Sequence, residues 1–218
     1  MKMTTILEQW HYQSVKKNIS VVLPDGCRDF IWKIESHRSQ YIVTELDNHA
    51  YFIEHNIGCQ YIGYRFYPGT VIQYTQLNDA LKKVEEFDNN IIITHLNEHT
   101  YLNDNIAEAL QSLSEYCPIR LCAKHLGVSQ RTLERLVDKY TQRSPVYWRN
   151  LARVRKTAAW LISTSTQSDQ ALADVAITFH FSDQAHMTRE FKLWFGVSPK
   201  QFKYNKQLYH SAFATGYN

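Results

Sequence analysis

The second half of this chain carries one sequence pattern twice, and this duplication limits its fold more than any other feature. The copies span residues 123–148 and 176–202 and align at offsets of 53 and 54 residues. Matching residues are Ala123, Ser129, Arg135, Ser144 and Pro145 in the first copy, and Ala176, Ser182, Arg189, Ser198 and Pro199 in the second. Each copy predicts a short helix, a tight turn and a longer helix, which is the helix-turn-helix arrangement. Two such units offer two helices of the same kind to one partner.

The longer helix of the first copy, residues 130–140, is predicted to begin at a Ser129 cap and to be amphipathic. Its apolar stripe consists of Leu133, Leu136, Val137 and Tyr140. The opposite face carries Arg131, Glu134, Arg135 and Asp138. Arginine pairs with guanine O6 and N7, and glutamate accepts from cytosine N4, so this face suits the major groove of DNA. The alternative is a solvated row of ion pairs worth a few tenths of a kcal/mol. The turn and the duplication favour DNA.

The longer helix of the second copy, residues 183–195, is predicted to begin at a Ser182 cap. Gln184, His186 and Arg189 point away from its apolar stripe, and Gln and Arg are both base-reading side chains. For His186, the alternatives to base reading are a surface histidine and a histidine that packs between helices. His180 stands where the first copy has Gly127. If that turn is left-handed, a non-glycine residue there costs on the order of 1 kcal/mol.

A long helix over residues 146–163 is predicted to join the two units. At 1.5 Å per residue it is about 27 Å long, close to the ~34 Å between major-groove faces on one side of B-DNA. It carries four cations, Arg149, Arg153, Arg155 and Lys156, of which we expect some to meet phosphates. The predicted phosphate contacts are Ser129, Arg149, Arg153, Ser182 and Lys200.

Residues 1–97 differ from the rest of the chain in charge and in predicted secondary structure. Residues 1–113 hold 9 Lys and Arg against 14 Asp and Glu, whereas residues 114–218 hold 15 against 7, which together give the net charge of +3. Strands are predicted at 19–23, 30–34, 41–46, 51–53, 61–67 and 91–96, with one helix at 77–87. The predicted fold class is α+β: a β-rich sensor or dimerisation domain (1–97), a linker (98–104), an all-α DNA-binding domain with two helix-turn-helix units joined by a long helix (105–205), and a tail (206–218).

The duplicated half resembles the DNA-binding domain of the AraC/XylS family of bacterial transcription regulators. The matching motifs are L-G-V-S-x-x-x-L-x-R, S-P-x-x-W, L-A-D-V-A, F-S-D-Q-A-H-M-x-R-x-F and F-G-V-S-P-K-Q-F. By motif, the resemblance implies base reading by Arg131, Glu134, Arg135, Gln184, Ala185, His186 and Arg189. The family has glycine where this chain has His180, so the second unit is expected to turn differently or to read less faithfully.

The N-terminal segments L-P-D-G-C-R-D-F-I-W and Y-I-G-Y-R-F-Y-P-G resemble a small β-rich domain that precedes such DNA-binding domains. In the family this domain binds an effector, dimerises, or both. An arginine flanked by aromatic residues can bind an anionic or planar ligand, and the candidate effector residues are Arg28, Trp32, Tyr64 and Arg65. The alternative is that Arg65 forms an ion pair with Asp25 or Asp29.

Several classes of function are not supported by the sequence. There is no G-x-S-x-G motif and no phosphate-binding glycine loop, and the pKa of Cys27 is expected to be raised among carboxylates, so we predict no enzyme and no cofactor. His11, His37, His49 and His55 lack a cupin-like spacing, so we predict no metal, although Glu54 between His49 and His55 keeps this open. Four cysteines, Cys27, Cys59, Cys117 and Cys122, form no C-x-x-C motif and are expected to be reduced and structural.

The sequence thus predicts a cytoplasmic, nucleoid-associated regulator that binds double-stranded DNA. No stretch has the length or hydrophobicity of a membrane span or a signal peptide. Expected partners besides DNA are RNA polymerase, a small-molecule effector and a second copy of the chain. One alternative is a protein-interaction module that pairs with a regulator or polymerase and reads DNA weakly. Another is a ligand-binding or enzymatic β domain with an incidental DNA tether.

Overall fold

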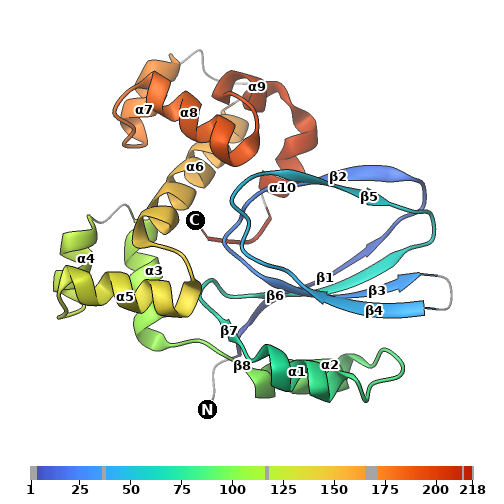
Figure 1. Cartoon of the computed structure of the whole chain (residues 1–218). Coiled ribbons are helices and arrows are strands. Elements are labelled where there is room, and N and C mark those ends of the chain that lie inside the picture. The colour runs from blue at the N-terminus through green and yellow to red at the C-terminus, as the bar shows by residue number, and fades with distance from the viewer. Residues whose placement is uncertain (1–3, 36–37, 116–117, 165–170, 213, 218) are drawn as a thin grey trace.

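A computed structural model describes residues 4–35, 38–115, 118–164, 171–212 and 214–217. The N-terminal part contains the strands β1 to β8 and the helices α1 and α2, and the helical part begins at α3 (Figure 1). The predicted fold class, a β-rich region followed by an all-α region, is confirmed. Cys117, one of the four cysteines, and His37 lie outside the described residues.

Two antiparallel sheets form the N-terminal part. The larger has the strand order β1-β6-β3-β4 and consists of β1 (Ile6–Gln13), β6 (Gln60–Phe66), β3 (Asp29–Glu35) and β4 (Arg38–Val43). The smaller pairs β2 (Asn18–Val22) with β5 (Tyr51–His55) and faces the larger one (Figure 1). A short pairing of β7 (Val71–Ile72) with β8 (Thr100–Tyr101) ties the start of the helical hairpin to its end.

A helical hairpin of α1 (Tyr74–Leu81) and α2 (Asn89–His99) covers the other face of the four-stranded sheet (Figure 1). Its apolar residues pack against one side of the sheet in a core formed by Phe30, Trp32, Tyr64, Phe66, Ile72, Leu77, Leu81, Ile92 and Leu96. Because side chains alternate along a strand, the residues between these point away from the hairpin, toward the smaller sheet.

The expected strand at 91–96 is wrong, because this segment forms the middle of α2. Its β-branched isoleucines favoured a strand, but Ile92 and Leu96 are four residues apart and both are fully buried against the sheet. Asp88 caps the helix by accepting from the amides of Asn90 and Ile91. The helix expected at 77–87 is instead α1, Tyr74–Leu81, and β1 was not predicted. Packing on the sheet outweighed local propensity here.

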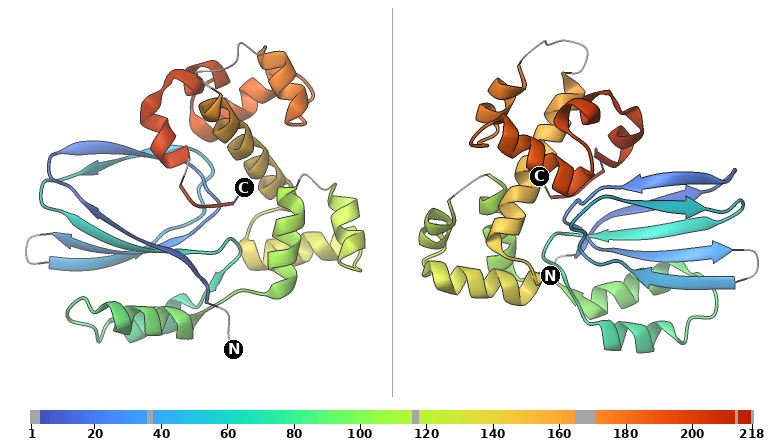
Figure 2. Two further views of the ribbon diagram at one scale, coloured as in Figure 1. Left: turned by 180° about the vertical axis from the view of Figure 1, so that it is seen from behind. Right: turned by 45° about the horizontal axis from the view of Figure 1, so that its top comes forward.

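The helical part forms one continuous apolar core. It contains α3 (Asp104–Ser114), α4 (Ile119–His125), α5 (Gln130–Thr141), α6 (Pro145–Ser163), α7 (Leu172–Thr178), α8 (Gln184–Phe195) and α9 (Pro199–Tyr204). The predicted joining helix is confirmed as α6, which runs between the two helix-turn-helix units in the views of Figure 2. None of the helices described here combines the length and the hydrophobicity needed to traverse a bilayer.

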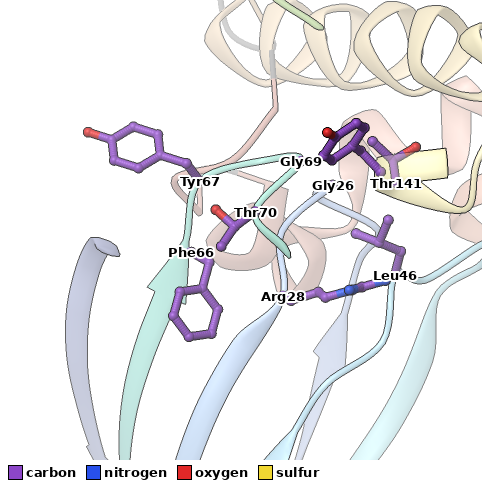
Figure 3. A pocket seen from close by; sticks show the side chains of 9 residues that line it. Gly26, Arg28, Leu46, Phe66, Tyr67, Gly69, Thr70 and Thr141 are labelled. Carbon is purple, nitrogen blue, oxygen red and sulfur yellow. The ribbon is translucent and has the colours of Figure 1, made fainter. Parts of the chain in front are cut away.

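The two parts pack closely against each other. Leu23 and Leu46 of the N-terminal part belong to the core of the helical part. The chain continues past α9 through a short 3-10 helix (Lys206–Leu208) and α10 (Tyr209–Ala212), and Tyr217 is then buried in the same core. Between the strand loops and the end of α5 the remaining hollow is only about 10 Å³, roughly the space of one water molecule (Figure 3).

Candidate nucleic-acid interface and ligand cavity

The first helix-turn-helix unit has the geometry that its sequence predicts. Gly127 is left-handed with φ of 67°, which ends α4 without a side-chain clash. Ser129 caps α5 by accepting from the amide of Thr132 at 3.1 Å. Arg131, Glu134 and Arg135 are all exposed on one face, while Leu133 and Val137 are fully buried on the other. Glu134 also accepts a hydrogen bond from Gln130, so its carboxylate is partly committed within the helix.

The second unit repeats this shape with a strained turn. His180 has φ of 59°, so it occupies the left-handed region in which glycine is preferred. The predicted Ser182 cap is wrong: Asp183 caps α8 by accepting from the amide of His186 at 2.6 Å. A carboxylate at this position also complements the positive end of the helix dipole. Ser182 lies one residue earlier and is exposed.

Not all of the base-reading residues predicted for α8 are equally available. Gln184, Ala185 and Arg189 are exposed, whereas Met187 is fully buried. His186 is half-buried, its Nδ1 lies 3.1 Å from the Ser182 hydroxyl, and its ring packs edge-on against Phe181. These contacts favour the packing role that the sequence left open for His186.

The cations of α6 differ in how far each is engaged in contacts within the protein. Arg153 is half-buried and its guanidinium lies 4.6 Å over the ring of Phe181, while it donates to the carbonyl oxygen of His180 at 3.3 Å. This arrangement holds α6 against the turn of the second unit. Arg155 is almost fully buried, and Lys156 donates to the carbonyl oxygen of Ser114 at 2.8 Å, so these two stabilise the fold. Arg149 is half-buried, and Lys200 is exposed at the start of α9.

A cavity of about 400 Å³ lies between the two sheets of the N-terminal part. Its wall includes Trp10, Tyr12, Ile31, Ile42, Tyr51, Ile53 and Tyr61, together with several charged residues. Of the four predicted effector residues, only Arg65 lines it. Trp32 and Tyr64 are buried on the opposite face of the sheet, under the helical hairpin. Tyr64 and Arg65 are neighbours on one strand, so their side chains point to opposite faces and do not share a cavity.

Arg28, the fourth predicted residue, precedes β3 and points away from the cavity. Its guanidinium lies 3.6 Å from the Glu45 carboxylate, and its side chain lines the small hollow of Figure 3. The structure therefore does not bring the four candidate residues together.

One end of the cavity is an ionic cluster around Arg65. Its guanidinium contacts Asp25 at 3.0 Å and Asp29 at 3.1 Å, so both ion pairs considered from the sequence form together. Burial lowers the pKa of Arg65, but the two carboxylates outweigh this and raise it. Burial raises the pKa of the nearby Cys27 thiol, and Asp25 adds to this effect, which agrees with the raised pKa expected from the sequence.

Asp47 also lines this end of the cavity, and burial, reinforced by Asp25, raises its pKa to about 6. The wall of the cavity thus holds the carboxylates of Asp25, Asp29 and Asp47 and the guanidinium of Arg65. The second nearby guanidinium, that of Arg155, approaches from α6, where burial lowers its pKa. An anionic ligand gains little at such a site, because Arg65 is already paired.

The same cluster connects the cavity to the helical part. Arg155 of α6 donates to the carbonyl oxygens of Pro24 at 3.4 Å and Ala214 at 2.8 Å. The amide of Tyr217 donates to the carbonyl oxygen of Asp25 at 2.7 Å, and its hydroxyl donates to Leu110 in α3. The 24–27 turn, the end of the described chain and α6 therefore form one packed unit.

The loop between β4 and β5 contacts both helix-turn-helix units. Arg143, which follows α5, donates to the carbonyl oxygen of Leu46 at 2.8 Å. The hydroxyl of Tyr147 donates to the carbonyl oxygen of Asp47 at 2.9 Å. The amide of Ala50 donates to the carbonyl oxygen of Trp194 in α8 at 2.9 Å.

Sequence reasoning missed one group of metal-ligating residues. Among the described residues, His95, Glu98 and His99 place their ligand atoms within 4.8 Å of one another. The H-L-N-E-H spacing was available as a signal, but His95 was assigned to a strand at 91–96 and Glu98 and His99 to the linker at 98–104, so the helical i, i+3, i+4 spacing was not recognised. Cys27, Cys59 and Cys122 are buried as free thiols.

Each unit thus combines a left-handed turn with a capped helix that has an exposed face, and α6 joins the two units. Residues 122–205 match the family described as "Helix-turn-helix domain".

The chain is 29% identical over 93 residues to the HTH-type transcriptional regulator ArgR of Pseudomonas aeruginosa. That match covers 43% of this chain and 27% of the relative, so the chain spans about a quarter of that protein's length. The C-terminal domain of AraT, a response regulator from Geobacillus stearothermophilus, is 22% identical with a TM-score of 0.41, over 46% of this chain and 84% of that one. ToxT from Vibrio cholerae is 10% identical with a TM-score of 0.44, over 90% of this chain and 96% of that one.

Proposed function

We propose that this protein is a sequence-specific transcription regulator that inserts α5 and α8 into successive major-groove segments of one DNA duplex. The observation that carries the proposal is the pair of exposed polar helix faces joined by α6, a single helix of 19 residues. At 1.5 Å per residue α6 is about 28 Å long. This length suits two groove segments on one side of B-DNA, which lie ~34 Å apart.

The base-reading residues that we propose are Arg131, Glu134 and Arg135 on α5, and Gln184, Ala185 and Arg189 on α8. All six are exposed. We give His186 a smaller part, because its ring nitrogen is engaged with Ser182. Of the predicted phosphate contacts we propose Ser129, Arg149, Ser182 and Lys200, because Arg153 is engaged with Phe181 and His180. The two cations, Arg149 and Lys200, supply salt-dependent affinity that is independent of sequence.

We further propose that the N-terminal part modulates DNA binding through a small molecule held in the cavity between the sheets. Trp10, Tyr51 and Tyr61 offer aromatic surface, and Asp47 offers a carboxylate that has no ion-pair partner within 4.0 Å among the described residues. A flat molecule with a positively charged amine fits this wall better than an anion. The ligand would act through the β4–β5 loop, which contacts both units.

The ligand class is tested with a matched pair of probes, phenethylamine and phenylacetate, in thermal unfolding of the full chain. The amine is expected to raise the melting temperature, and Asp47→Asn to reduce this shift. Stabilisation by the carboxylate alone would contradict the assignment.

DNA reading is tested by gel shift on genomic fragments over a salt series. The Arg131→Ala/Arg135→Ala variant is expected to lose the specific complex, because each bidentate arginine–guanine pair contributes about 1–3 kcal/mol of discrimination. Lys16→Ala/Lys17→Ala removes the same charge from the turn after β1 and serves as the control, with little expected effect. Weak binding of the wild-type protein to all fragments alike would refute sequence-specific regulation and favour a protein-interaction module.

A further inference from the structure

The last turn of α2 carries three potential metal ligands on one face. His95, Glu98 and His99 occupy positions i, i+3 and i+4, so their side chains project in the same direction. Their ligand atoms all lie within 4.8 Å of one another, and His95 Nδ1 is 3.5 Å from a Glu98 carboxylate oxygen. The His95 and His99 rings lie nearly parallel, with centroids 6.3 Å apart.

The surroundings of this face favour a cation. The three residues line an open hollow together with Glu85, Glu86 and Asp88, against one cation, Lys83. The carbonyl groups at the end of a helix add negative potential at its last turn. The Nδ1 atom of His95 is buried and donates or accepts no hydrogen bond within the described part of the chain. A metal ion would satisfy this nitrogen.

The backbone beneath the ligands is held firmly. The carbonyl oxygen of His99 accepts from the amide of Gln73 at 2.9 Å. The hydroxyl of Thr100, which is buried, donates to the carbonyl oxygen of Leu96 at 2.6 Å. Leu96 itself is fully buried against the sheet. His95 and His99 therefore project from a backbone turn held by hydrogen bonds. The Glu98 side chain is 58% exposed and has room to move toward a bound ion.

We propose that His95, Glu98 and His99 form a Zn²⁺ site, with water completing the coordination. Two imidazoles and one carboxylate are ligands that zinc prefers, whereas Mg²⁺ and Ca²⁺ prefer oxygen ligands alone. His99 is followed directly by β8, which leads to α3 at Asp104. An ion bound here stabilises the junction between the N-terminal part and the DNA-binding domain.

The test is isothermal titration of the full chain with ZnCl₂ in a chelator-free buffer with a phosphine reductant. The wild-type protein is expected to bind about one equivalent, as one site requires, and to melt at a higher temperature with zinc. His99→Gln and Glu98→Gln should each weaken binding at least tenfold, and His95→Gln should abolish it. His125→Ala removes an exposed histidine from α4 and should leave binding unchanged.

Circular dichroism of each variant without metal separates loss of the site from loss of folding. If His95→Gln does not fold, the test uses Glu98→Gln, at a more exposed position, and His99→Gln, at the last residue of α2. The proposal is overturned if wild-type protein shows no saturable zinc binding, if MgCl₂ binds equally well, or if a folded Glu98→Gln/His99→Gln variant binds zinc as the wild type does.

Discussion

Gly26 provides the sharpest test of how the N-terminal part is attached to the DNA-binding domain. It lies in the 24–27 turn with φ of 76°, and it faces the helical part directly. A Cβ atom added here would lie 2.7 Å from the Cβ of Tyr217 and 3.0 Å from side-chain atoms of Leu151 and Trp148. All three neighbours are buried, so none has open space into which to move.

The cost of Gly26→Ala has two parts. An alanine in the left-handed region costs about 1–2 kcal/mol. Forcing a methyl group into a packed interior costs about 1–3 kcal/mol more. We therefore expect a total destabilisation of about 2–5 kcal/mol, and partial separation of the two parts if the contact opens instead.

Gly58→Ala is the matched control for this experiment. Gly58 has a similar φ of 81°, but nothing lies within 4 Å of the position of its added Cβ. It isolates the backbone penalty of about 1–2 kcal/mol. Urea unfolding followed by tryptophan fluorescence compares the two variants. Equal losses of unfolding free energy would refute the close packing of the 24–27 turn against α6 and Tyr217.

Two further predictions concern single residues. His180→Gly is expected to raise the unfolding free energy by up to about 1 kcal/mol in thermal denaturation, because φ of 59° is strained for histidine; a fall in stability would contradict this. Burial raises the pKa of Asp47 from 3.8 to about 6, because the folded protein favours the neutral carboxyl. The stability that this preference contributes is present below about pH 4 and is lost as the pH rises through 6, where the buried carboxyl becomes charged. Asp47→Asn should therefore be more stable than the wild type at pH 7 but not at pH 4, with the exposed Glu54→Gln as control, and equal differences at both values would contradict the shift.

The helical part was largely predictable because its signals are local. The Leu133 and Val137 stripe, the Ser129 cap and the Ser144-Pro145 start are each properties of a few consecutive residues. The exception is the cap of α8, where the serine at 182 and the aspartate at 183 are both good capping residues. The structure places Asp183, and not Ser182, at the cap.

The N-terminal part was less predictable because packing decides its structure. The run of isoleucines in α2 has strand-forming residues but becomes a helix, because Ile92 and Leu96 cover the face of a sheet built from distant segments. The predicted site residues also divide into those set by local sequence and those set by packing. Arg131 and Arg135 are exposed, as their spacing predicts. Trp32 and Tyr64, in contrast, lie on the face of the sheet under the helical hairpin, whereas Arg65 lies on the other face and lines the cavity.

The sequence by itself determined the duplicated helix-turn-helix units, their exposed polar faces and the helix that joins them, since each follows from helical spacing and end signals. Only the tertiary structure decided which cations remain available, because Arg155 is buried by the 24–27 turn, a segment about 130 residues earlier in the chain. It also decided the cavity and its carboxylate-rich end, which arise where two sheets meet. Burial and long-range ion pairing depend on contacts between distant segments, and local sequence does not encode them.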